Sequence, residues 1–306
     1  MIIAVFPGQG SQTPGFLSPW LEIDGTRERL AEASEHAGVD LLAAGTEWDA
    51  DRIRDTSVAQ PLIVAASLLS WSVLRDRAAT AADGVAGHSV GEFAALAASG
   101  VLSEADALRL VGIRGRAMAE AAATVQTGMS AVVGGDEQTV LDRLDALGLT
   151  PANYNGGGQI VAAGELAALA ELAAEAPRGS RVIPLQVAGA FHTRFMQPAV
   201  ETLRAAAADV AASTPETTLW TNSDGSVVDD GRRAVDLVVS QVSSPVRWDR
   251  NMASFAEHGV TGIIELAPAG ALTGLAKRAL RGTPTVAVKT PDDLDAAVAL
   301  LKGEQA

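Results

Sequence analysis

Residues 87–92, with the sequence GHSVGE, constrain the fold of this chain more than any other segment. A short apolar run at 84–86 precedes them, and a helix-forming run at 93–98 follows. The pattern G-x-S-x-G between a strand and a helix is typical of a nucleophile elbow, a tight turn that presents a serine hydroxyl at a helix N-terminus. Free N–H groups and the helix dipole there stabilise a developing oxyanion. The segment therefore predicts a nucleophilic Ser89, and an ordinary helix N-cap serine is the alternative.

Strand-like and helix-like segments alternate along the chain, which is typical of an α/β protein with a largely parallel sheet. Apolar runs at 2–6 and 84–88 predict buried strands. The pattern predicts a further strand at 261–266 and helices at 26–37, 58–75, 103–123, 198–213, 247–258 and 271–280. Ser103, followed by Asp106, resembles a capping box at the start of the third of these helices.

Shorter elements begin near Thr127 and end near Val187. Apolar runs predict strands at 129–133, 159–163 and 181–185, with helices at 136–147 and 165–175. A β-α-β-α-β order within about 60 residues fits a separate ferredoxin-like lobe. We therefore predict a catalytic core made of residues 1–126 and 188–306, with residues 127–187 as an insert.

Composition excludes several classes of function. The net charge of −14 argues against nucleic acid or an anionic membrane surface as a partner. We expect no apolar run of the roughly 18–20 residues needed to span a bilayer, and the N-terminus has no basic signal region. The chain has no cysteine, which excludes thiolate catalysis and cysteine metal sites and makes the cytoplasm the default location. We expect no metal and no cofactor.

A serine nucleophile needs a base, and histidine is the usual choice because it titrates near neutral pH. The chain has four histidines. His36 and His258 lie at predicted helix ends and are interpreted as structural, and His88 is expected to point away from the neighbouring Ser89. His192 remains, in a predicted loop after a strand, and its alternative role is to cap the next helix. No acidic residue nearby stands out as a third member of a triad.

Residues 6–12 (FPGQGSQ) follow the first predicted strand. Their glycine spacing matches neither a P-loop nor a dinucleotide-binding motif. Loops after the carboxyl ends of parallel strands line the ligand crevice of such sheets. A loop amide near Gln9 could therefore provide one oxyanion donor, with the N–H of Val90 as the other.

Arg114 is the most informative charged residue. On the predicted helix 103–123 it shares one face with apolar residues at positions 107, 110, 111, 118 and 121. A buried guanidinium is costly unless it is paired, and its planar fork suits a carboxylate. The partner is either a substrate carboxylate or a structural acidic residue. Arg109 and Arg116 lie off this face and are interpreted as solvated.

The residues resemble one family closely, the malonyl-CoA:acyl carrier protein transacylases, which are related to the acyltransferase domains of polyketide synthases. The match covers almost the whole chain in family order, through residues 8–12, 87–92, 113–116, 153–158, 189–193, 244–248, 265–274 and 289–294. The resemblance implies an α/β-hydrolase-like parallel-sheet core with an inserted ferredoxin-like small subdomain.

The resemblance also implies a role for each candidate residue. Ser89 would be the acylated nucleophile and His192 the general base and acid. The oxyanion hole would be formed by Gln9 and Val90, and Arg114 would bind the malonyl carboxylate. Gln241 would orient the histidine through its backbone carbonyl, and Phe191 would select malonyl by crowding a methyl group at the α-carbon.

The implied reaction transfers malonyl from malonyl-CoA to the phosphopantetheine thiol of an acyl carrier protein, by ping-pong kinetics through a malonyl-serine intermediate. It would supply fatty acid synthesis, polyketide synthesis or both. A serine thioesterase would use the same elbow and histidine, but an arginine among apolar residues argues against neutral acyl substrates. A non-catalytic binding protein is the third possibility.

An acidic carrier protein would have to dock on a local basic cluster, because this chain is itself acidic. Lys277, Arg278 and Arg281 form the densest basic run, on a helix expected to begin after residue 270. Lys277 and Arg281 are four residues apart and would share one face of that helix. Arg181 is a second candidate. The alternative is that these are ordinary solvated charges at a helix end.

Overall fold

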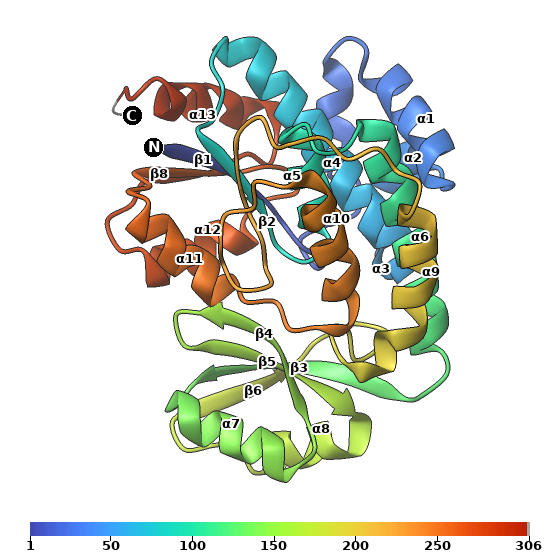
Figure 1. Cartoon of the computed structure of the whole chain (residues 1–306), viewed down its shortest axis with the longest axis vertical. Coiled ribbons are helices and arrows are strands. Elements are labelled where there is room, and N and C mark those ends of the chain that lie inside the picture. Colours follow the sequence, from blue (N-terminus) through green and yellow to red (C-terminus); the bar gives the residue numbers. More distant parts are fainter. Residues whose placement is uncertain (305–306) are drawn as a thin grey trace.

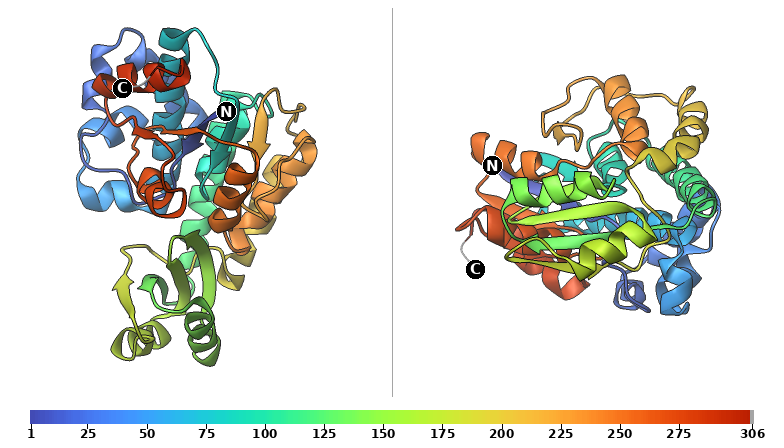
Figure 2. Two further views of the ribbon diagram at one scale, coloured as in Figure 1. Left: turned by 90° about the vertical axis from the view of Figure 1, so that its left-hand side faces the viewer. Right: turned by 90° about the horizontal axis from the view of Figure 1, so that it is seen from below.

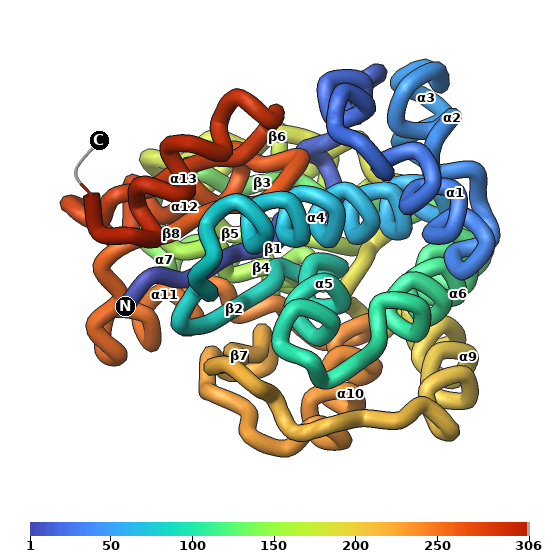
Figure 3. The backbone as a smooth tube through the Cα atoms, turned by 90° about the horizontal axis from the view of Figure 1, so that it is seen from above, coloured from blue at the N-terminus to red at the C-terminus, as the bar shows by residue number. Residues whose placement is uncertain are grey.

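A five-stranded parallel sheet forms the centre of the larger lobe in the computed structural model, which describes residues 1–304. The strand order is β7-β2-β1-β8-β9, and Figure 3 shows β1 between β2 and β8. The central strand, with the sequence IIAVF, is almost completely buried, as expected for a parallel strand covered on both faces. The strands are β1 (Ile2–Phe6), β2 (Gly84–Gly87), β7 (Thr218–Trp220), β8 (Gly262–Glu265) and β9 (Thr285–Ala287).

Helices cover both faces of this sheet (Figure 1). The three that carry or support the elbow are α4 (Thr56–Ala78), α5 (Gly91–Ala98) and α6 (Glu104–Ala122). The others are α1 (Thr26–Ala37), α2 (Leu41–Thr46), α3 (Ala50–Arg54), α9 (Gln197–Ala207), α10 (Gly231–Ser240), α11 (Trp248–Glu257), α12 (Ala271–Ala279) and α13 (Leu294–Leu301). The predicted α/β class with a parallel core is confirmed.

Helix α4 differs from its prediction in two ways. It begins at Thr56, because the Asp55 side chain accepts a hydrogen bond from the Ser57 N–H, and so Pro61 lies inside the helix rather than in its first turn. The expectation that no segment is apolar enough to span a membrane was also wrong, since α4 has the required length and composition. It is nevertheless a core helix here, with 78% of its most apolar window buried in the protein.

The smaller lobe is a four-stranded antiparallel sheet of order β4-β5-β3-β6, with two helices on the face away from the larger lobe (Figures 1 and 2). Its elements are β3 (Thr127–Gly134), α7 (Glu137–Ala146), β4 (Thr150–Gly156), β5 (Gln159–Glu165), α8 (Leu166–Ala174) and β6 (Ser180–Pro184). The order is βαββαβ, the complete ferredoxin-like pattern. Strand β4 was missed because its sequence, TPANYNG, has a proline and little apolar alternation.

Sheet register brings the two predicted functional loops together. Strands β1 and β2 pair in parallel with Phe6 opposite Gly87, so the loop containing Gln9 and the elbow leave the sheet side by side at its carboxyl edge. The β4–β5 hairpin of the smaller lobe approaches this edge, and the N–H of Tyr154 donates to the carbonyl of Val246 (2.9 Å). The crevice expected beside this edge therefore lies between the two lobes.

Candidate active site

Ser89 occupies the tight turn between β2 and α5. Its φ angle is +52°, the left-handed conformation that a nucleophile elbow imposes on a non-glycine residue. The N–H of Gly91 closes the turn by donating to the carbonyl of His88 (2.9 Å). A Cβ atom on Gly87 would overlap the backbone of Gly91, and one on Gly91 would overlap the carbonyl of Phe6. Both glycines are therefore required by close packing of the backbone.

Asn222 fixes the elbow from the loop after β7. Its Oδ1 accepts from the N–H of Ser89 (2.7 Å), and its Nδ2 donates to the carbonyl of Gly87 (2.7 Å). The side chain is completely buried. Sequence reasoning missed this residue because β7 has only three residues, and the turn-like sequence TNSDG that follows it was the available signal.

His192 lies directly against the nucleophile. Its Nε2 is 2.7 Å from the Ser89 Oγ, and its Nδ1 is 2.7 Å from the backbone carbonyl oxygen of Gln241. A carbonyl oxygen can only accept, so Nδ1 carries the proton and Nε2 is free to accept the proton of the serine. Burial lowers the pKa of His192 to about 3, with the Arg114 charge adding to the effect, so the ring is neutral at pH 7.

The other histidines lie outside this contact. The Nε2 of His88 pairs with the Oδ1 of Asn155 (2.9 Å), so its ring points toward the smaller lobe, as its position on the strand predicts. His36 is in the last turn of α1 and His258 follows the last residue of α11.

Two backbone N–H groups remain available beside the serine. Within residues 1–304, neither the N–H of Gln9 nor that of Val90 donates a hydrogen bond. The side chain of Gln9 donates instead to the carbonyl of Arg54 (3.2 Å), which anchors the loop to the end of α3. Val90 is the N-cap of α5 and Gln9 lies in the loop after β1, and free N–H groups of this kind are suited to stabilise negative charge on a reacting oxygen.

Arg114 is buried, with 1% of its surface exposed. Its Nη1 donates to the Oε1 of Gln60 (2.7 Å), and its Nη2 donates to the Oε1 of Gln241 (3.0 Å) and approaches the Ser89 Oγ (3.4 Å). Its Nε has no partner among the described residues. No carboxylate in residues 1–304 lies within ion-pair distance of it. Burial lowers its pKa to about 10, so it keeps its charge at neutral pH.

Glu92 and Gln60 complete this cluster, and sequence reasoning assigned neither of them a role. Glu92 is buried in the first turn of α5, where it accepts from the backbone N–H of Asn222 (2.8 Å) and from the side-chain Nε2 of Gln241. Burial raises its pKa to about 7, although its hydrogen bonds and Arg114 oppose the shift. The signal available in the sequence was an acidic residue three positions after the nucleophile, on the face of α5 that enters the core.

Phe191, the candidate specificity residue, is buried beside His192 in the main hydrophobic cluster, which also contains Met118.

The candidate docking residues are at the surface. Lys277 and Arg281 are exposed, as are Arg278 and Arg181. Helix α12 ends at Ala279, so the prediction that Lys277 and Arg281 share one helix face was wrong. Leu280 caps the helix with non-helical backbone angles, and the positive φ of Gly282 belongs to the turn that follows.

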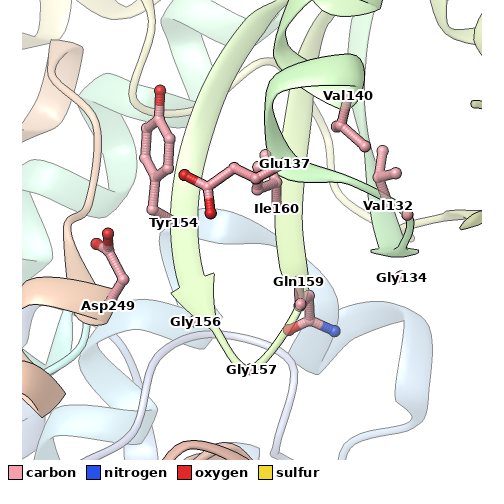
Figure 4. Close-up of a pocket in the computed structure, with 12 residues that line it drawn as sticks. Val132, Gly134, Glu137, Val140, Tyr154, Gly156, Gly157, Gln159, Ile160 and Asp249 are labelled. Atoms are coloured by element: carbon pink, nitrogen blue, oxygen red, sulfur yellow. The ribbon is translucent and has the colours of Figure 1, made fainter.

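Two cavities involve the smaller lobe, and one of them reaches the site at Gln241. One, of about 650 Å³, opens between the lobes and is lined by Gln241, Pro245 and Arg247 of the larger lobe and Tyr154 of the smaller lobe. The other, of about 440 Å³, lies in the smaller lobe around the β4–β5 hairpin (Figure 4). None of the candidate residues lines the second cavity, whose charged groups are the carboxylates of Glu137 and Asp249.

Comparison with known proteins agrees with this geometry. Residues 3–301 match the family model described as acyl transferase domain. The chain is 53% identical over 297 residues to the malonyl CoA-acyl carrier protein transacylase of Mycobacterium tuberculosis, covering 96% of this chain and 98% of that protein. The crystal structure of MCAT from the same organism superposes with a TM-score of 0.94 at 52% identity, covering 97% of this chain and 100% of that one.

A third relative was solved with a partner. It is a malonyl-transacylase in complex with its type II polyketide synthase acyl-carrier protein, 30% identical, with a TM-score of 0.93 over 98% of this chain and 99% of that one. These similarities extend over nearly the full length of every chain compared. The chain therefore belongs to the malonyl CoA-acyl carrier protein transacylase family.

Proposed function

We propose that this chain is an acyl-carrier-protein S-malonyltransferase, which moves the malonyl group of malonyl-CoA to the phosphopantetheine thiol of an acyl carrier protein. The observation that carries the proposal is Arg114, a buried cation 3.4 Å from the nucleophile and held by neutral amides. An acyl group that ends in a carboxylate supplies a negative charge that can hydrogen-bond to Arg114 directly. Family membership supports the same substrate.

In the first half-reaction, the Nε2 of His192 takes the proton of Ser89 while its Oγ attacks the thioester carbonyl carbon. The negative charge that develops on the carbonyl oxygen is stabilised by the N–H groups of Gln9 and Val90. The tetrahedral intermediate then breaks its C–S bond. The proton held by His192 passes to the departing sulfur, which leaves coenzyme A as the free thiol and malonyl as an ester of Ser89.

The second half-reaction reverses these steps with a different thiol. The phosphopantetheine thiol of the carrier protein gives its proton to His192 and attacks the ester carbonyl, and the Ser89 oxygen leaves and takes that proton back. The carbonyl oxygen of Gln241 holds the ring tautomer that both halves need (2.7 Å). Because each half releases one product before the next substrate reacts, the kinetics are ping-pong.

The carrier protein belongs to fatty acid synthesis, polyketide synthesis or both. We propose that it docks at the cleft between the inserted lobe, residues 127–187, and the core formed by residues 1–126 and 188–306. Arg278 packs close to Gly157 of the β4–β5 hairpin, so this basic segment lies beside the smaller lobe. Its exposed neighbours Lys277 and Arg281 are the proposed contacts of the carrier protein. Phe191 is proposed to limit substitution at the malonyl α-carbon.

We also propose a cytoplasmic location, because both thioester substrates must be present in the same compartment as the enzyme. The burial of α4 supports this, since its apolar surface is used inside the protein. Separation of cell extracts into cytosolic and membrane fractions tests the location, and recovery of the chain in washed membranes would contradict it.

Intact-mass analysis tests the function itself. Mixing the protein with malonyl-CoA is expected to add one malonyl group, and peptide mapping is expected to locate it on Ser89. Adding a phosphopantetheinylated carrier protein is expected to remove the adduct and to place it on the carrier. An adduct that persists in Ser89→Ala, or one that water removes as fast as the carrier protein does, would contradict the proposal.

A further inference from the structure

The side-chain amide of Gln241 joins the two halves of the site. Its Oε1 accepts from Arg114 (3.0 Å), and its backbone carbonyl accepts from the Nδ1 of His192 (2.7 Å). Its Nε2 donates to the carboxylate of Glu92 and to the Oδ1 of Asn222 (3.1 Å). One residue therefore positions both the base and the cation, and the orientation of its amide decides whether Arg114 meets an acceptor or a donor.

The chemistry of its neighbours fixes that orientation. Arg114 has only donors, so it requires the amide oxygen, whereas an ionised carboxylate has only acceptors, so Glu92 requires the amide nitrogen. If the amide turned over, N–H groups would face a guanidinium and an oxygen would face a carboxylate. Both contacts would be repulsive in a buried site, where unpaired polar groups cost most.

The carboxylate of Glu92 is satisfied on both oxygens by donors. Oε1 accepts from the backbone N–H of Asn222, which cannot rotate away, and Oε2 accepts from Gln241. A neutral amide at position 92 has one acceptor for these two donors, so its NH2 group would face either Asn222 or Gln241. Two acceptors, and hence an ionised carboxylate, are what this position requires.

We propose that Glu92 is a positioning residue for malonyl transfer: its ionised carboxylate holds the Gln241 amide in the orientation that keeps Arg114 aimed at the acyl carboxylate. The inference rests on the proposed function and adds a residue to it. Glu92 acts through Gln241 and does not touch substrate. Loss of its charge is therefore expected to weaken the use of malonyl more than the use of acetyl, which has no carboxylate.

Ionisation of Glu92 gives the inference a pH signature. Its pKa is raised to about 7, so the carboxylate is charged above that pH and protonated below it. Arg114 of α6 is the charged group facing it, whereas the loop after β7 presents Thr221 and Asn222. Helix α10, which also packs on α5, turns Val235 and Val238 inward. The pKa values of His192, about 3, and Arg114, about 10, lie outside the range from pH 5.5 to 8.

The test measures the initial rate of Ser89 acylation by malonyl-CoA and by acetyl-CoA, and takes their ratio. At pH 8, Glu92→Gln is expected to lower the malonyl-to-acetyl ratio by about tenfold or more, the size of a lost hydrogen bond to a charged group. Glu265→Gln is the matched control. Glu265 is also a completely buried carboxylate, and it accepts from the N–H groups of Leu272 and Thr273 (2.9 and 2.8 Å) at the start of α12. That variant is expected to lose stability without changing the ratio.

The pH dependence of the wild-type malonyl-to-acetyl ratio is a second measurement. Between pH 8 and pH 5.5 its malonyl-to-acetyl ratio is expected to fall several-fold, and in Glu92→Gln this dependence is expected to vanish. A flat wild-type ratio, or an equal loss for both acyl groups in Glu92→Gln, would overturn the role of Glu92. Failure of wild-type Ser89 to accept malonyl at pH 8 would overturn the proposed function as well, so the two failures are distinguishable.

Discussion

Two arginines of this molecule, Arg114 in the larger lobe and Arg143 in the smaller one, meet opposite surroundings. Arg143 belongs to α7 and pairs with two carboxylates at the end of α8, those of Glu171 (3.2 Å) and Glu175 (3.0 Å), with 26% of its side chain exposed. Arg114 is far more buried, yet its side-chain partners are neutral: two glutamine oxygens and, at 3.4 Å, the Ser89 hydroxyl.

The contrast separates an arginine that holds the fold from one that is kept for a ligand. Acidic partners neutralise Arg143, so it joins two helices and has no charge left for a third group. Glutamine oxygens satisfy the N–H groups of Arg114 without cancelling its charge. A buried cation that no carboxylate contacts directly is costly, and Glu92 acts on Arg114 only across the amide of Gln241. A carboxylate ligand lowers that cost when it binds.

The largest effect is expected from removing each arginine in turn. Arg114→Ala is expected to slow malonyl transfer to Ser89 by about 100-fold or more, because charge-assisted hydrogen bonds to the acyl carboxylate are lost. Acetyl transfer is expected to survive. Arg143→Ala is the matched control and is expected to change stability by at most about 1 kcal/mol, with both rates unchanged. Equal losses for the two acyl groups in Arg114→Ala would make that residue structural.

The next largest effect is expected from giving Arg114 a carboxylate partner, as Arg143 has. Gln60→Glu keeps the shape of the side chain and places a carboxylate 2.7 Å from the Nη1 of Arg114. The internal ion pair is expected to reduce malonyl acylation by about tenfold or more, since the ligand would then compete with a permanent partner. Acetyl acylation should stay near that of wild type. An unchanged malonyl rate would show that neutrality of the partners is unimportant.

Discrimination between acyl groups that differ at the α-carbon is expected to be a smaller effect. It is assigned to Phe191, beside His192, rather than to Arg114. If the ring of Phe191 crowds a methyl group, malonyl-CoA is preferred over methylmalonyl-CoA by about 10- to 200-fold, the value of one methyl group in a pocket. Phe191→Ser is expected to narrow this preference, measured as the ratio of kcat/KM values. A constant ratio would place selection at another residue.

The smallest effect concerns cations at the surface. Reversing Lys277 and Arg281 to Glu is expected to raise the KM for the carrier protein several-fold and to leave acylation by malonyl-CoA unchanged, because exposed charges mainly affect encounter. Added salt should weaken the wild-type interaction more than that of the variant. An unaltered KM would place the docking surface elsewhere.

The parts of the site that depend on a local sequence pattern could be predicted from the sequence. The elbow follows from two glycines and the strand and helix beside them, and the burial of Arg114 follows from the spacing of apolar residues on α6. The partners Gln60, Glu92 and Asn222 were missed, because they meet across 19 to 149 positions in the sequence. Amides and carboxylates carry no periodic signal, and only the folded chain shows which donors face which acceptors.

Two errors in the predicted secondary structure also arise because contacts distant in the sequence were not visible. Strand β4 lacks apolar alternation and is held by its pairing with β5, and α12 stops one residue before its predicted end. Arg281 lies beyond the end of the helix in either case, so it does not share a helix face with Lys277. Local composition therefore predicts which elements exist better than it predicts where they end.

Competition between two acyl donors tests the central claim most directly. The wild-type protein is given equal concentrations of malonyl-CoA and acetyl-CoA at pH 8, quenched within the first turnover and examined by intact mass. If the charge of Arg114 is reserved for an acyl carboxylate, Ser89 should carry malonyl almost exclusively. Equal amounts of malonyl- and acetyl-Ser89 would contradict the claim, because the buried cation would then contribute nothing to the choice of substrate.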